Sequence, residues 1–410
     1  MGRRKRNIRR KLVTTEPQHI SRRGLLGVGA GIAAAAAIST STDFTPAATA
    51  AETAGRVHGD RTIPFFGARQ AGIDTPLTQR VAHLVYRLKP DTDRDRLRNM
   101  LRILSDDSAR LTRGMAPLAD SEPELAVAPA RLTVTIGVGT ELVSRTGAAV
   151  PAWLGPLPQF PIDALRPEWT GGDLLLTIQG DDLLTVEHAV RVLNRNTRFF
   201  CEPAYSHRGF LPAHGSHEPG ATPRNLFGQV DGTVNPTPGT EDFAQVAWID
   251  DGSWLQNGTS FVLRRIDMNL DKWDTLDRPD REKSVGRTLD TGAPLGGHNE
   301  FDEPDFTARD GMGMPVIPDL AHMRRARMSD RSQRIARRGH SFVDVIDGET
   351  VSGLLFGSFQ RDVTAQFVPI QESLAKADML NIWTTPVGSA VFAIPPGCAE
   401  GGFVGETLFI

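Results

Sequence analysis

The sequence is poor in the residues from which disulfide scaffolds and thiolate metal sites are built. Cys201 and Cys398 are the only cysteines among the 410 residues, which is too few for either structure. Whether these two form a single bridge stays open. The chain also has no Gly-rich phosphate loop, no serine-centred nucleophile elbow and no Cys/His spacing for zinc. The usual motifs of nucleotide-binding proteins, serine hydrolases and zinc proteins are therefore absent.

The N-terminal region contains no apolar run long enough to span a membrane. The uncharged stretch Gly24–Ile38 is shorter than the roughly 18 apolar residues that a spanning helix needs. It follows Arg22–Arg23, and small residues at Ala48 and Ala50 suit a signal peptidase. We therefore expect residues 1–50 to be a twin-arginine export signal; an ordinary secretory signal or a membrane anchor is the alternative. Because that route carries folded proteins, the leader also hints at a cofactor inserted before export.

Removal of this leader leaves an acidic protein. Residues 1–50 hold nine of the 46 Lys and Arg and two of the 49 Asp and Glu, so the remainder has 46 − 9 = 37 basic and 49 − 2 = 47 acidic residues. A net charge of 37 − 47 = −10 argues against nucleic acid as a partner. A mature chain of this length exceeds one typical core, and we expect domains at 51–225 and 226–410.

Hydrophobic periodicity predicts the same kinds of element in both halves. The predicted elements of the first half are strand 81–88, helix 93–114, strand 130–139, strand 172–182 and helix 183–196. Those of the second half are strand 251–270, helix 270–287, strand 353–360, helix 367–380 and strand 390–397. The order in the first half is typical of a ferredoxin-like α+β unit. We therefore expect an α+β protein with two ferredoxin-like domains and antiparallel sheets.

The segment from Gly286 to Met328 is long, irregular and rich in Gly, Pro and Asp. Such a stretch inside a compact domain is usually functional or disordered. It contains His322, in "PDLAHMRRARM", which is a candidate ligand, although a lone histidine of this kind is more often simply packed.

The other candidate functional residues also have ordinary structural explanations. Asp231 lies in "VDGT", and Asp-Gly is a favoured turn pair. Arg337 and Arg338 in "RIARRGHSF" are also compatible with solvated charge before a strand. Asp362 in "FQRDV" is also placed to cap a helix that begins near Thr364.

Ten short motifs, taken together, resemble the dye-decolourising peroxidase family of haem enzymes. "RNLFGQVDGTVNP" resembles the family's GxxDGT signature, with its aspartate at Asp231. The other motifs follow in the family's order across nearly all of the mature chain: "GARQAGI", "GGDLLLTIQGDD", "SHRGF", "VGR" with "TGAPLGG", "AHMRRA", "ARRGHSF", "GLLFGSFQRD", "FVPIQ" and "VFAIPPG". The twin-arginine signal resembles that of the exported bacterial branch, which includes deferrochelatase. Three positions depart from the family pattern, namely Arg69, Val285 and His340, and they put the substrate range in doubt rather than the cofactor.

The resemblance implies one haem b per chain, held in the C-terminal domain. It makes His322 the proximal ligand of the iron, with Asp362 as the expected acceptor for its second ring nitrogen. Asp231 and Arg337 are the implied catalytic pair on the opposite face, where Asp231 moves the proton of peroxide and Arg337 stabilises developing negative charge. Arg287 and Arg338 are the expected partners of the haem propionates.

The resemblance therefore implies an exported haem peroxidase that uses hydrogen peroxide to oxidise bulky aromatic or other organic donors. We expect its pH optimum in the acid range. The alternative is a haem-binding protein of iron acquisition, a deferrochelatase, that releases iron from haem. A non-haem α+β binding protein is a third possibility. The six tryptophans outnumber the two tyrosines as candidate electron relays, although most are expected in the core. The physiological donor and the oligomeric state stay open.

Overall fold

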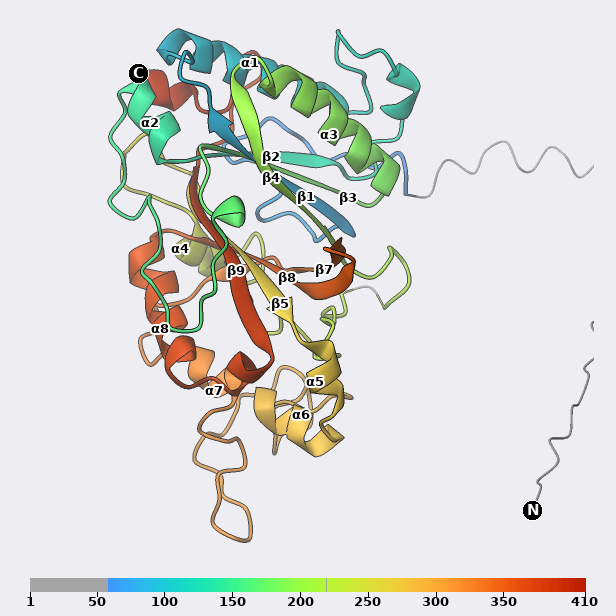
Figure 1. The fold of residues 1–410 in the computed structure, drawn as a ribbon, viewed down its shortest axis with the longest axis vertical. Coiled ribbons are helices and arrows are strands. Elements are labelled where there is room, and N and C mark those ends of the chain that lie inside the picture. Colours follow the sequence, from blue (N-terminus) through green and yellow to red (C-terminus); the bar gives the residue numbers. More distant parts are fainter. Residues whose placement is uncertain (1–57, 219) are drawn as a thin grey trace, which may run out of the picture. The chain divides into compact units, whose positions relative to one another are not determined.

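The strands of the N-terminal half are apolar along almost their whole length. β1 (Arg80–Leu88), β2 (Thr133–Val138) and β3 (Leu174–Gly180) are buried at nearly every position. Continuous rather than alternating burial means that both faces of this sheet are covered. In the computed structural model, which describes residues 58–218 and 220–410, α1 and α3 lie side by side over this part of the sheet (Figure 1). The predicted leader at 1–50 lies outside the described residues.

Local sequence signals set the ends of the two long helices. α1 (Arg94–Leu111) begins after Asp93, whose side chain accepts a hydrogen bond from the Arg96 amide. α3 (Leu183–Thr197) begins after Asp182, which accepts from the Thr185 amide. Such caps satisfy amides that have no partner within the helix. Both helices bury an apolar face in the largest hydrophobic core, which confirms the predicted helices.

The strands of the described residues form one antiparallel sheet that closes on itself. Besides β1, β2 and β3 it contains β4 (Cys201–Phe210), β5 (Thr259–Met268), β6 (Ala336–Arg337), β7 (His340–Ile346), β8 (Glu349–Gln360) and β9 (Thr384–Ile394). Its order is β5-β9-β2-β3-β1-β4-β7-β8-β6, with a further pairing between β5 and β8. Two four-stranded groups, β2-β3-β1-β4 and β9-β5-β8-β7, meet through single residue pairs at Val138↔Ala393 and Phe210↔Ser341. If the strands of each group are numbered one to four along the chain, both groups have the spatial order 2-3-1-4. The fold is thus α+β with an antiparallel sheet, and residues 58–410 belong to one compact unit.

The C-terminal half departs from the predicted elements in two ways. The helix expected over 270–287 is two helices, because Asp277 caps a new helix that has Pro279 in its first turn. This half also contains two strands that were not predicted, β6 and β7, and a third unpredicted strand, β4, lies in the N-terminal half. The remaining helices are α2 (Thr140–Thr146), α4 (Glu241–Ala247), α5 (Leu270–Asp274), α6 (Arg278–Val285), α7 (His322–Ala326) and α8 (Val368–Ala377). The shorter elements are the π-helical turn η3 (Val363–Phe367) and the 3₁₀ turns η1 (Pro123–Leu125), η2 (Pro167–Trp169), η4 (Met379–Ile382) and η5 (Glu406–Phe409).

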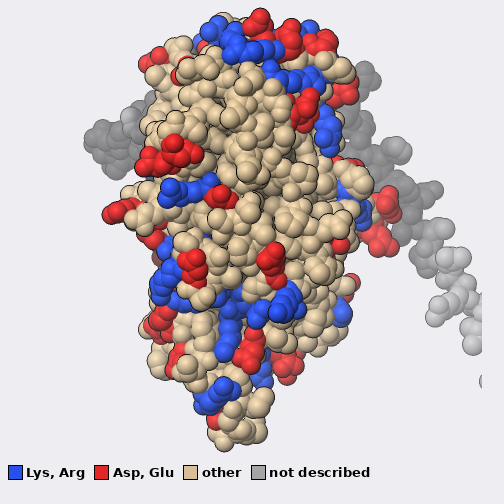
Figure 2. Space-filling view, turned by 90° about the vertical axis from the view of Figure 1, so that its left-hand side faces the viewer, with Lys and Arg blue, Asp and Glu red and all other residues tan. Residues whose placement is uncertain are grey.

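Figure 2 shows acidic and basic side chains interspersed over one face of the molecule. Within 58–218 and 220–410, no helix combines the length and the apolar character needed to cross a bilayer. Cys201 and Cys398 are both buried and unbridged, which answers the question that the sequence left open.

Candidate functional site

A cavity of about 470 Å³ lies in the C-terminal half. Its walls come from β5, β8 and β9, from α7 and α8, and from the loop that carries Asp231. Figure 1 shows α7 and α8 near one end of β5 and β9. The apolar part of the lining includes Phe227, Ile266, Met268, Leu354, Phe356 and Leu374. A cavity of this size with an apolar wall and a few polar groups is typical of a cofactor site.

His322, at the start of α7, projects into this cavity and is held from behind by Asp378. Nδ1 of His322 donates to Oδ2 of Asp378 at 2.6 Å. Asp378 ends α8 and caps the following turn, because its other oxygen accepts from the Leu380 amide. Its side chain is 4% exposed, whereas that of His322 is 33% exposed, toward the cavity. The second ring nitrogen of His322 has no hydrogen-bond partner among the described residues and is free for a ligand.

The Asp378 carboxylate also determines the basicity of the ring. Burial alone lowers the pKa of His322, but the charge and the hydrogen bond of Asp378 outweigh it, so the pKa lies above its ordinary value. A carboxylate behind a ligating histidine fixes the tautomer and makes the free nitrogen a stronger donor to metal.

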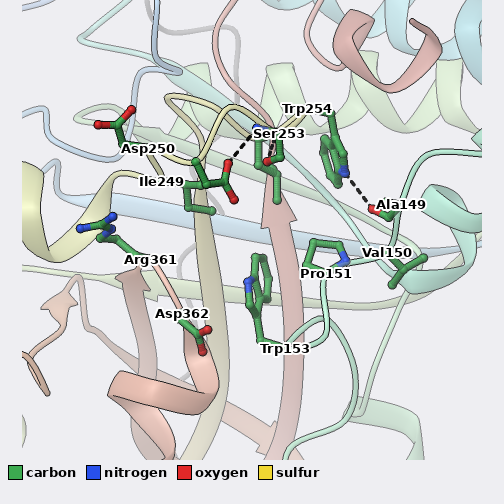
Figure 3. Close-up of a pocket in the computed structure, with 12 residues that line it drawn as sticks. Ala149, Val150, Pro151, Trp153, Ile249, Asp250, Ser253, Trp254, Arg361 and Asp362 are labelled. Atoms are coloured by element: carbon green, nitrogen blue, oxygen red, sulfur yellow. Dashed lines mark hydrogen bonds between the residues drawn. The ribbon is translucent and has the colours of Figure 1, made fainter.

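The prediction that Asp362 accepts from His322 is wrong. Asp362 caps η3 by accepting a hydrogen bond from the Ala365 amide, which is the ordinary structural alternative for this residue. It lines a different, smaller cavity together with Trp153 and Trp254 (Figure 3). The acceptor behind His322 is Asp378, which lies 56 residues further along the chain. Nothing in the spacing of the sequence connects these two residues.

Asp231 and Arg337 form an ion pair on the cavity wall. Nη1 of Arg337 lies 2.8 Å from Oδ1 of Asp231. Asp231 is placed by a turn in which Gly232 has a φ of 136°, so it occupies an Asp-Gly turn and also directs a carboxylate into the cavity. Arg337 is held through its backbone by Asn235, whose amide side chain accepts from the Arg337 N–H at 3.0 Å and donates to its carbonyl at 2.9 Å.

The ion pair keeps Asp231 ionised. Burial raises the pKa of Asp231, but the charge of Arg337 and the hydrogen bonds from Asn225 and Arg337 together lower it below the ordinary value. Asn225 Nδ2 donates to Oδ2 of Asp231 at 3.3 Å. The carboxylate therefore remains able to accept a proton at acid pH.

Of the two other predicted arginines, the structure places only one at the cavity. Arg287 lines it, 7% exposed, and donates to the carbonyls of Gly292 and Glu300 at 2.6 and 2.8 Å. The prediction for Arg338 is wrong. Its side chain points away from the cavity and donates to the carbonyls of Ile73 and Thr75. Neighbouring residues of an extended chain project to opposite faces, so Arg337 and Arg338 cannot both face the cavity.

Arg264 is a cavity residue that the sequence did not indicate. It lies on β5 in the same alternating row as Ile266 and Met268, and its side chain is 1% exposed. One guanidinium nitrogen pairs with Asp163, while Nε and Nη1 have no hydrogen-bond partner. Buried donors without partners are costly in a folded protein. Such a group in a cavity wall suits an anionic part of a ligand.

These residues fit a haem. The free nitrogen of His322 would bind the iron, the apolar wall would contact the porphyrin, and Arg264 and Arg287 would offer positive charge to its carboxylates. Within the described part of the chain, no group of three or more His, Cys, Asp or Glu side chains is arranged to hold a metal ion. A single histidine as the protein ligand agrees with iron that is otherwise held by a macrocycle.

Comparison with protein families gives matches across both halves of the chain. The model described as "Dyp-type peroxidase, N-terminal" matches residues 70–211, and "Dyp-type peroxidase, C-terminal" matches residues 222–399.

Two curated relatives are similar over most of their length. A dye-decolorizing peroxidase of Thermobifida fusca is 37% identical over 96% of this chain and 98% of its own. A deferrochelatase of Escherichia coli O157:H7 is 30% identical over 84% of this chain and 86% of its own.

Solved structures are similar in fold as well. A DyP-type peroxidase from Cellulomonas bogoriensis has a TM-score of 0.83 at 48% identity, covering 86% of this chain and 99% of its own. Ferric DtpA from Streptomyces lividans has a TM-score of 0.82 at 36% identity, covering 86% and 98%.

Proposed function

This chain belongs to the Dyp-type peroxidase family and is a haem-dependent oxidoreductase that acts on peroxide, and we propose that the cavity around His322 is its active site. The observation that carries the proposal is the placement of four side chains on one cavity, in two pairs: His322 with Asp378 behind it, and Asp231 with Arg337. A histidine that would bind the iron and an acid–arginine pair that would handle the proton of peroxide are what a haem peroxidase requires.

His322 would hold the haem iron through the ring nitrogen that does not contact Asp378. Arg287 and Arg264 are placed to bind the two propionates, and this role would satisfy the unpartnered nitrogens of Arg264. When bound, the haem supplies the redox centre that passes electrons from a donor to peroxide. The finer arrangement, with haem b carried by the second of two ferredoxin-like halves, is part of this proposal, and the identical strand order of the two halves supports it.

Asp231 and Arg337 supply the proton chemistry. Hydrogen peroxide must lose a proton from one oxygen and gain one on the other before its O–O bond breaks, and ionised Asp231 is placed to carry that proton. Arg337 holds a fixed positive charge beside Asp231 and offers further N–H donors to the departing oxygen. Because the pKa of Asp231 is lowered, this chemistry works in acid, and bulky aromatic compounds are the proposed donors.

The deferrochelatase relative gives the alternative a specific basis, since it covers 84% of this chain. Release of iron from haem needs the cofactor site around His322 but has no requirement for a group that moves the proton of peroxide. The variants Asp231→Ala and Arg337→Ala separate the two activities. Peroxidase turnover that falls while haem stays bound supports the enzyme, whereas unchanged turnover in both variants removes the Asp231–Arg337 mechanism. Free iron and free porphyrin appearing without peroxide would favour the alternative.

Export by the twin-arginine route is also a proposal, based on Arg22–Arg23 and the weakly apolar run that follows. It places the protein outside the cytoplasmic membrane, free or at the cell surface. Replacing both arginines by lysine would keep the charge and is expected to retain the folded protein in the cytoplasm. Fractionation of cells with an antibody to the mature chain measures this directly, and unchanged export of the variant would reject the route.

A further inference from the structure

A second cavity, of about 330 Å³, lies outside the haem site and has no role in the chemistry described above. Three separate segments line it: residues 149–153, residues 249–255, and Arg361 with Asp362 just after β8. Trp254 Nε1 donates to the Ala149 carbonyl at 2.8 Å and ties the first two segments together. Figure 3 shows Trp153 between Pro151 and Asp362.

The chemical character of this cavity is aromatic and acidic. Trp153 and Trp254 are only partly buried, so their rings remain available for stacking. Two carboxylates of the lining, Asp251 and Asp362, carry the negative charge of the proposed site, and Arg361 is the one guanidinium of the lining. Asp250 also borders the cavity, but its Oδ1 accepts a hydrogen bond from Gln256 Nε2 at 2.7 Å and its carboxylate points away from both indoles (Figure 3). Among the described residues none of the three carboxylates has an ion-pair partner.

The carboxylates are held in place although they are not neutralised. Asp251 accepts from the Ser253 amide at 2.9 Å, and Asp362 accepts from the Ala365 amide at 2.9 Å. Both hydrogen bonds use Oδ1, which leaves the second oxygen of each carboxylate for a ligand. A carboxylate attracts a cation through its charge, and a neighbouring indole ring attracts the same cation through its quadrupole.

The turn η3 lies between the second cavity and the wall of the haem cavity. Asp362 caps η3, and Phe367, the last residue of that turn, lines the haem cavity. A molecule bound beside Asp362 would therefore contact the N-terminal end of a turn whose last residue lines the haem cavity.

We propose that this cavity binds an aromatic cation as an electron donor for the peroxidase. The proposal rests on the function assigned above. Two donor molecules each lose one electron, and these two electrons with two protons reduce one hydrogen peroxide to two waters. The indoles of Trp153 and Trp254 stack on the donor, and Asp251 and Asp362 balance its charge.

The test uses the full haem-loaded protein and a cationic dye, thionine, with an anionic sulfonated anthraquinone dye for comparison. The variant Asp251→Asn/Asp362→Asn removes two charges, and asparagine can still cap η3 and the 251–253 turn. Asp250→Asn is the control, because it removes one charge from the loop that carries Asp251, while the Asp250 carboxylate is directed away from both indoles in Figure 3.

Equilibrium dialysis without peroxide is the first readout. We expect thionine to bind the double variant more weakly, by about two- to fivefold for each carboxylate removed, and to bind the Asp250→Asn protein like wild type. The KM for thionine should rise in parallel, with the KM for the anionic dye and for peroxide unchanged. Equal binding to wild type and the double variant, or equal weakening by Asp250→Asn, overturns the proposal. If the wild-type protein shows no peroxidase turnover with any donor, the proposed function is rejected. The dialysis would still show whether thionine binds at this cavity.

Discussion

Asp378 lies behind His322 and accepts a hydrogen bond from its Nδ1 at 2.6 Å. The two residues come from different helices, and each is fixed by its own element: His322 opens α7, while Asp378 joins α8 to η4. The remaining ring nitrogen faces the cavity with its tautomer already set. The site is thus organised around a histidine whose direction and basicity are imposed by a buried carboxylate.

Replacing Asp378 by Asn should weaken the proximal site. The variant keeps the size of the side chain but removes the charge that favours a strongly donating His322, and loss of such a partner typically costs about 10–100-fold in metal affinity or activity. Haem retention and the kcat/KM for peroxide, measured with the anionic dye as donor, report the effect. Asp362→Asn is the matched control and should leave both quantities unchanged, because Asp362 contacts Ala365 rather than His322.

Adjacent arginines should behave in opposite ways. Arg337→Ala removes the cation beside Asp231 and should lower kcat/KM for peroxide by about 100- to 1000-fold, the usual cost of losing one electrostatic donor in an active site. Arg338→Ala should instead lower the free energy of unfolding by about 1–3 kcal/mol, since its hydrogen bonds to Ile73 and Thr75 are lost. Steady-state kinetics and chemical denaturation of both variants separate these effects. A similar loss of turnover in the two proteins would contradict the assignment.

The acid limit of activity should move when Asn225 is removed. In the wild type, Asp231 must be ionised, so activity falls as the pH drops through its lowered pKa. Asn225 contributes to that lowering through the hydrogen bond to Oδ2, and Asn225→Ala should therefore raise the pKa and shift the acid limb of kcat/KM to higher pH. A pH profile with a small donor tests this. An acid limb that stays in place, or moves lower, would show that Asp231 is not the titrating group.

Gly286 lies against Met323 of α7 and should not tolerate a side chain. Gly286 has a φ of 92°, and a Cβ there would lie 2.8 Å from Sδ of Met323, the residue after His322. Gly286→Ala should cost roughly 1–3 kcal/mol through backbone strain and should also disturb the placement of α7. Thermal unfolding and haem content report the two effects. Gly311→Ala is the control, because a Cβ at Gly311 meets nothing within 4 Å, and its Tm should remain that of the wild type.

Elements governed by local signals were predictable from the sequence. Asp93 and Asp182 mark the starts of α1 and α3 as capping residues, and apolar periodicity defines their buried faces. The break between α5 and α6 was missed although Asp277 and Pro279 provide a local signal for it. The short strand β6 was missed because two residues carry no periodicity, and it exists only through its pairing with β8.

The residues of the functional site were predictable from the sequence only where a family motif contains them. Asp231, His322, Arg287 and Arg337 were proposed and all line one cavity. Asp378 was not, because the closure of 56 residues onto His322 depends on tertiary packing rather than on spacing. Arg264 was missed and Arg338 misplaced for a related reason. The face on which a strand residue projects follows from sheet register, which neighbouring strands determine.

The absorption spectrum of the His322→Gly protein tests the central claim most directly. The account predicts that purified wild-type protein has a Soret band with the signature of histidine ligation, and that the glycine variant loses the haem or that ligation. Imidazole added to the variant should restore the band by occupying the space that the side chain leaves. A His322→Gly protein with full haem content and an unchanged axial-histidine spectrum would contradict the account.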